Sequence, residues 1–69
     1  MKSISGKKLG GILERRGWTF MRVQGSHHIF GRTESIVRIS VPIHGSKPLK
    51  IGLFKFLLKQ AGLSEKDLS

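Results

Sequence analysis

The sequence has no cysteine, few acidic residues and no long apolar run, and each shortage excludes a class of protein. Without cysteine, neither disulfide bonds nor thiolate metal sites can support the core of a 69-residue chain, and an intracellular, reducing location fits. No stretch approaches the roughly 20 apolar residues that cross a bilayer, and the polar start does not resemble a signal peptide. We therefore expect one soluble, cytoplasmic domain over residues 1–69, with no membrane contact.

The four acidic residues are scattered along the chain, at Glu14, Glu34, Glu65 and Asp67. Nucleases that use two divalent metals need clustered carboxylates, so this distribution disfavours a magnesium-dependent mechanism. A zinc site is also disfavoured, because His27 and His28 diverge on a strand and only His44 could join one of them. The glycine patterns of nucleotide-binding loops are absent. We expect neither a metal nor a small-molecule cofactor.

Positive charge dominates the composition. Lys and Arg number 13 against 4 Asp and Glu, which gives a formal net charge of +9. A domain this basic attracts polyanions through counterion release, so nucleic acid leads the expected partners, ahead of acidic proteins and anionic membranes. A ribosome-associated or merely well-solvated basic protein is the alternative that composition leaves open.

The hydrophobic pattern predicts an α+β protein, because helical spacing flanks a region of alternating residues. The expected elements are a helix over residues 6–16, strands over 18–24, 27–32 and 36–41, a helix over 50–61 and a short turn over 64–68. The short connections make the three-stranded sheet an antiparallel meander. Each helix has one apolar face, so both should pack on one face of the sheet as a two-layer sandwich, which leaves the other face open.

Three helical positions do not fit this pattern. Gly10 and Gly11 interrupt the first helix, where each costs up to about 1 kcal/mol relative to Ala, and we expect a close approach of another element to explain them. Phe56 points away from the apolar stripe of the second helix. We expect the end of the chain to cover it, with a partner protein as the alternative.

Two adjacent histidines begin the second strand. Successive strand residues face opposite sides, so His28 shares a face with Phe30 and His27 points the other way. The size of Phe30 predicts that its face is the core, which places His27 on the open face. Histidine can both take and give a proton near neutral pH. A solvated side chain without a role is the alternative for His27.

Metal-free RNA cleavage is the reaction that an exposed imidazole among cations supports. Attack of the 2′-hydroxyl on phosphorus needs a base, an acid and positive charge. We expect His27 to serve as acid and base and Arg22 and Lys47 to contact phosphate; His44 is a candidate second acid/base, or else a loop residue bonded to backbone. The rival functions are a noncatalytic module that binds duplex RNA by its shape, and an interaction protein that docks through the open face and Phe56.

Several motifs in a fixed order cover nearly the whole chain: Gly17-Trp18, Arg22, Gly25-Ser26-His27-His28-Ile29-Phe30, Val41-Pro42-Ile43-His44, Lys47-Pro48-Leu49-Lys50-Ile51-Gly52 and Leu57-Leu58-Lys59-Gln60-Ala61-Gly62-Leu63-Ser64. Together they closely resemble the HicA toxin family of HicAB toxin-antitoxin systems. The chain departs from the family pattern at Gly10-Gly11 and at Leu53, where a Thr commonly follows the glycine. Both departures concern helix packing rather than the proposed chemistry.

The resemblance implies a fold similar to the double-stranded RNA-binding domain and the activity of an mRNA interferase, a ribosome-independent endoribonuclease that cleaves messenger RNA. It implies His27 as the catalytic histidine, with Gly25 and Ser26 shaping its turn where RNA would bind. It also implies a HicB-like antitoxin partner that covers the active site and takes part in repressing the operon.

Overall fold

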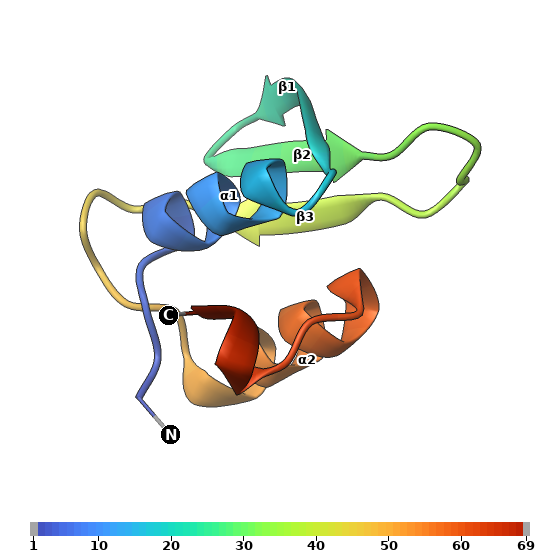
Figure 1. Cartoon of the computed structure of the whole chain (residues 1–69). Helices are drawn as coiled ribbons and strands as arrows, with labels where there is room; N and C mark the ends of the chain where they lie inside the picture. The colour runs from blue at the N-terminus through green and yellow to red at the C-terminus, as the bar shows by residue number, and fades with distance from the viewer. Residues whose placement is uncertain (1, 69) are drawn as a thin grey trace.

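Within residues 2–68, two α-helices and a three-stranded antiparallel sheet follow one another in the predicted order (Figure 1). The computed structural model describes residues 2–68. Its elements are α1 (Gly6–Arg15), β1 (Thr19–Gln24), β2 (His27–Gly31), β3 (Ile39–Pro42), α2 (Ile51–Ala61) and a 3₁₀ turn, η1 (Glu65–Leu68). The α+β class and the helix-strand-strand-strand-helix order are thereby confirmed. Within residues 2–68, no helix is long and apolar enough to span a membrane.

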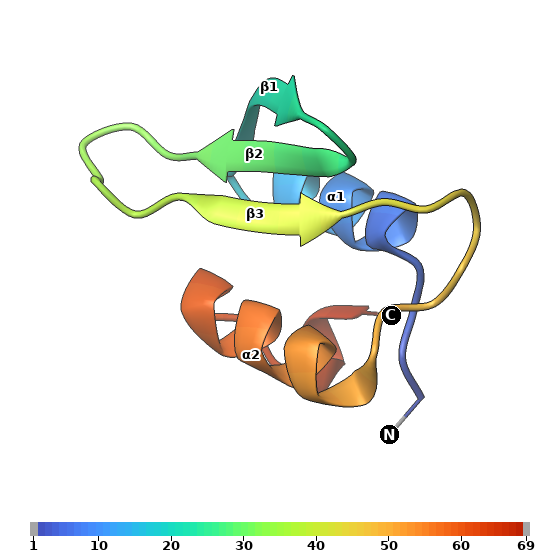
Figure 2. The same cartoon turned by 180° about the vertical axis from the view of Figure 1, so that it is seen from behind.

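One face of the sheet carries the core. Phe30 of β2 pairs with Ile39 of β3, and His28 pairs with Val41, so these four side chains share a face. The buried cluster combines that face with both helices, as predicted; its members are Leu9, Leu13, Trp18, Phe30, Ile39, Val41, Leu49, Phe54, Leu57, Leu58 and Ala61. Figure 2 shows α1 behind the sheet and α2 alongside β3.

The start of α1 is fixed by a cap. The Ser5 side chain accepts a hydrogen bond from the backbone N–H of Lys8 at 3.1 Å, which satisfies one of the free donors of the first turn. The two central glycines differ. A Cβ on Gly10 would lie 3.0 Å from the Phe30 ring, so close packing explains this residue as predicted. A Cβ on Gly11 would meet only the end of the Arg15 side chain, so the prediction is wrong for Gly11.

The third strand is shorter than predicted. It begins at Ile39, not at residue 36, and Ile36 lies in the loop between β2 and β3 with 96% of its surface exposed. Local bonds hold this loop: the Arg38 guanidinium donates to the carbonyls of Ser35 (2.9 Å) and Val37 (3.0 Å), and the Val37 N–H donates to the Ser35 hydroxyl. Such side chain-to-backbone bonds compete with strand pairing. The alternation of polar and apolar residues gives no sign of this competition, so it predicted too long a strand.

The second helix ends at Gly62, whose φ of 73° is the left-handed conformation that stops a helix. The following residues do not cover Phe56, which remains 58% exposed, so that expectation is wrong. Leu63 and Leu68 pack against the core cluster instead.

The segment between β3 and α2 is tied to the N-terminal segment. The Leu49 N–H donates to the Ile4 carbonyl at 2.9 Å, and Ser5 forms an antiparallel bridge with Pro48. These contacts position the loop that carries His44 relative to the end of the sheet.

Candidate functional site on the open face of the sheet

The two histidines at the start of β2 lie on opposite faces, as predicted. His27 is exposed and pairs with Gln24 of β1 and Pro42 of β3. His28 is half-buried on the helix side, where its ring centroid lies 5.4 Å from that of Phe20. The His27 imidazole is therefore exposed to solvent, and the His28 imidazole lies on the side of the sheet that faces α1.

A cross-strand hydrogen bond orients the His27 ring. Its Nδ1 lies 2.9 Å from the Ser40 hydroxyl on β3. Ser40 pairs with Ile29, so it occupies the diagonal position next to His27 on the open face. Because Nδ1 is engaged, Nε2 is the ring nitrogen left to meet a ligand.

A β-bulge places Arg22 on the same face. Phe20 pairs with Phe30 and Arg22 pairs with Ile29, so Met21 is the extra residue between them. Simple alternation would set Arg22 on the helix face with Phe20. The bulge places Arg22 on the opposite face, diagonally across from His27. Residues in such diagonal positions on neighbouring strands are about 7–8 Å apart.

The β1–β2 turn forms one end of the site. Gly25 has a φ of 61°, the left-handed conformation that glycine adopts at low cost. The Ser26 carbonyl accepts a hydrogen bond from the Ile43 N–H at 2.8 Å, which joins the turn to the chain leaving β3. His27 therefore emerges from a turn that is held on both sides.

A hollow of about 270 Å³ lies beside Pro42, at this end of the sheet. His44, Lys47 and Lys50 line it together with Pro42, the residue that pairs with His27. The Lys47 N–H donates to the His44 carbonyl at 3.1 Å, so a turn keeps these two residues near each other. Across residues 2–68, the His44 ring forms no hydrogen bond, to backbone or to His27.

The charge around His27 is positive. In the described part of the chain, no acidic residue belongs to the three strands or lines the hollow. Asp67, in η1, is occupied elsewhere, because its carboxylate pairs with Arg16 at 3.4 Å. No group of three or more histidine and acidic side chains gathers within residues 2–68 to hold a metal ion.

Two residues of this surface were not predicted. Ser40 carries no signal of its own, because only the β2–β3 register sets it beside His27. Lys50 could have been predicted as a phosphate contact, since it is basic and close in sequence to Lys47. It was instead assigned to the start of the predicted helix over residues 50–61. It lies just before α2 and lines the hollow.

Comparison with protein families identifies a relationship for this chain. The family model described as HicA toxin of bacterial toxin-antitoxin matches residues 6–63, which is most of the chain and contains every residue of the open face named above. No curated protein matches the chain significantly.

Proposed function

Because the chain belongs to the HicA toxin family, we propose that it is the toxin of a type II toxin-antitoxin system, a cytoplasmic endoribonuclease that cleaves messenger RNA without a metal ion. The observation that carries this proposal is the exposed His27 ring, held through Nδ1 by Ser40. A basic patch alone would support binding. An oriented imidazole within such a patch supports chemistry as well.

His27 acts on the 2′-hydroxyl of the bound RNA. Nε2 takes the hydroxyl proton while the 2′-oxygen bonds to the adjacent phosphorus, and the bond from phosphorus to the 5′-oxygen breaks. The products are a 2′,3′-cyclic phosphate and a 5′-hydroxyl. In this reaction the starting tautomer carries its proton on Nδ1, which then donates to the Ser40 hydroxyl 2.9 Å away before and after the transfer, so the ring keeps its orientation as it becomes charged. His44 is the candidate donor of the proton that the 5′-oxygen receives.

Cations stabilise the charge on phosphorus. We expect Arg22, on β1, and Lys47, in the loop after β3, to contact the phosphate. The Gly25-Ser26 turn offers a small, low-profile surface over which the RNA backbone can pass. General acid–base catalysis of this kind contributes about 10²- to 10⁴-fold to the rate.

The protein partner of this surface is a HicB-like antitoxin. An inhibitor that covers His27 must meet a positive face, so an acidic docking segment is expected. Docking there would exclude RNA and thereby neutralise the toxin.

Incubation of purified protein with messenger RNA in EDTA tests the proposal. We expect fragments that end in a 2′,3′-cyclic phosphate, and no cleavage where the 2′-hydroxyl is replaced by hydrogen. Intact RNA retained by the protein in a salt-sensitive complex would instead establish a noncatalytic RNA-binding module. Absence of RNA affinity at low salt would point to an interaction protein.

A further inference from the structure

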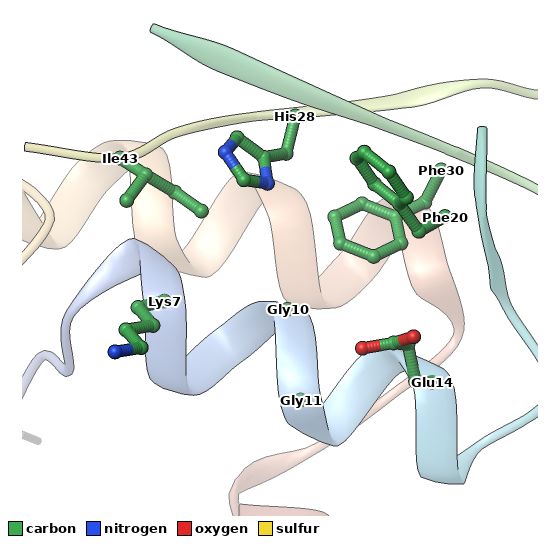
Figure 3. Close-up of a pocket in the computed structure, with 8 residues that line it drawn as sticks. All are labelled: Lys7, Gly10, Gly11, Glu14, Phe20, His28, Phe30 and Ile43. Atoms are coloured by element: carbon green, nitrogen blue, oxygen red, sulfur yellow. The ribbon is translucent and has the colours of Figure 1, made fainter. Parts of the chain in front are cut away.

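A second groove lies on the other side of β2, between α1 and the sheet (Figure 3). Its volume is about 290 Å³. Lys7, Gly10, Gly11 and Glu14 line it from α1, and His28 and Phe20 line it from the sheet. None of these residues belongs to the surface around His27.

The floor of the groove is bare helix backbone. The Phe30 ring packs so closely on Gly10 that it leaves no room for a side chain there. At Gly11, only the end of the Arg15 side chain lies near the Cβ position. A glycine inside a helix is destabilising relative to alanine, so Gly11 carries a cost that packing does not explain. Because Gly11 has no side chain, the groove is open between the helix backbone and the aromatic rings of the sheet.

The opposite wall is aromatic. The Phe20 ring is 42% exposed, and its centroid lies 5.4 Å from that of His28 and 6.0 Å from that of Phe30. Exposed aromatic rings are the platforms on which single-stranded nucleic acids stack their bases.

Opposite charges mark the two ends of the floor. Lys7 and Glu14 are seven residues apart on one helix, a rise of about 10.5 Å, with Gly10 and Gly11 between them (Figure 3). Within residues 2–68, the Glu14 carboxylate has no ion pair or hydrogen bond, although the protein is strongly basic. A carboxylate only accepts hydrogen bonds, so its ligand must present N–H or O–H groups.

We propose that this groove is a nucleobase subsite for the RNA strand bound at His27, and that it prefers guanine. Guanine presents two neighbouring donors, N1–H and the 2-amino group, that match both oxygens of the Glu14 carboxylate. The ring stacks on Phe20 over Gly11, and Lys7 contacts a phosphate. Adenine and cytosine offer an amino group without an adjacent ring N–H, and uracil offers only a ring N–H.

The strand can reach both sites because they meet at one end of the sheet. Ile43, which lines the groove, is bonded to Ser26 in the turn that precedes His27. A chain that crosses this turn places neighbouring nucleotides on opposite faces of β2. This inference rests on the proposed function for the identity of the strand, and it adds a source of sequence preference.

Titration of the ¹⁵N-labelled full chain with each nucleoside 5′-monophosphate tests the subsite without requiring cleavage. We expect guanosine monophosphate to shift the amides of Gly10, Gly11 and His28 at the lowest concentration. Gly11→Leu fills the slot and should weaken binding by about tenfold or more, the worth of one stacked base. Gly52→Leu is the matched control, because Gly52 is also helical and has nothing near its Cβ position; it should bind as the wild type does.

Glu14→Gln should reduce guanine affinity to that of the other bases without abolishing stacking. The proposal is overturned if no nucleotide shifts the groove amides, if Gly11→Leu binds as well as Gly52→Leu, or if Glu14→Gln keeps the preference. Shifts produced only by peptides would assign the groove to a protein partner and also overturn it. Cleavage with unshifted groove amides refutes the subsite alone, whereas groove binding without cleavage refutes the nuclease alone.

Discussion

At the scale of single residues, the central contact is the hydrogen bond between His27 Nδ1 and the Ser40 hydroxyl. Alternation along β2 was enough to predict which histidine faces solvent, because it depends only on neighbouring residues. The bond itself was not predictable, because it depends on the register between β2 and β3. The alternation of residues along β2 therefore identified His27, whereas the pairing of β2 with β3 places Ser40, which orients its ring.

Replacing Ser40 should slow the chemical step. Ser40→Ala removes the hydroxyl that is hydrogen-bonded to Nδ1, and the loss of a hydrogen bond worth about 0.5–1.5 kcal/mol corresponds to a rate reduced by roughly two- to thirteenfold. We expect kcat to fall with KM unchanged, and Ser40→Thr to restore the rate because it keeps the hydroxyl. An equal fall of kcat in Ser40→Ala and Ser40→Thr, or a change confined to KM, would contradict the role of Ser40 in positioning His27.

At the scale of elements, the β-bulge in β1 decides which face of the sheet carries Arg22, and it could not be predicted from the sequence. Met21 adds one residue to the strand and so turns Arg22 toward His27. No turn signal marks this insertion, since bulges depend on pairing with the next strand. The order of the elements was predictable because each has a strong period; the start of β3 was not, because local bonds around Ser35 replace pairing.

Two glycines of α1 should respond oppositely to alanine. A Cβ on Gly6 would clash with the backbone carbonyl of Pro42, which cannot move without displacing β3, so Gly6→Ala should lower the free energy of unfolding by about 1–3 kcal/mol. Gly11→Ala meets open space and should raise it by up to about 1 kcal/mol. Urea denaturation of both variants measures the difference, and equal effects would refute the packing of α1 on the end of β3.

The final turn should depend on pH through Asp67. The hydrogen bond from the Ser64 backbone N–H lowers the pKa of this carboxyl below its usual 3.8; desolvation opposes the shift, and the Arg16 charge and the Ser64 hydroxyl add to it. A lowered pKa stabilises the fold above pH 3.8, and that stabilisation is lost as the pH falls through the lower, folded-state value.

The chemical shift of the Ser64 amide provides the measurement. In the wild type we expect it to titrate with a midpoint below pH 3.8, and in Asp67→Asn, which keeps an acceptor but not the charge, it should not titrate in acid. A wild-type midpoint above 3.8 would contradict the hydrogen-bonded geometry of the turn.

At the scale of the whole molecule, the positive charge is spread over several elements of the chain. The net charge of +9 was enough to predict a polyanionic partner. It could not predict which cations lie near one another, because Arg22 belongs to β1 and Lys47 to the loop after β3, and their positions depend on strand pairing and on the course of that loop.

Binding to an uncleavable 2′-O-methyl RNA should show a steep salt dependence. If Arg22, Lys47 and Lys50 each neutralise a phosphate, they contribute about −2 to the slope of log K against log salt, at roughly −0.7 per contact on a single strand, and a phosphate contact by Lys7 adds a further −0.7 or so. Arg22→Gln should make the slope shallower by about 0.7, whereas Lys59→Gln, near the far end of α2, should leave it unchanged. Fluorescence anisotropy over a salt series measures both, and equal slopes for the two variants would remove Arg22 from the interface.

The catalytic role of His27 is tested by the cleavage rate of His27→Ala, compared with that of the wild type in EDTA on the same messenger RNA. The side chain is exposed, so the variant should fold, which its amide spectrum can verify. We predict that it still binds RNA but cleaves at least about 100-fold more slowly. A folded His27→Ala protein that cleaves at the wild-type rate would contradict the assignment of His27 as the catalytic residue.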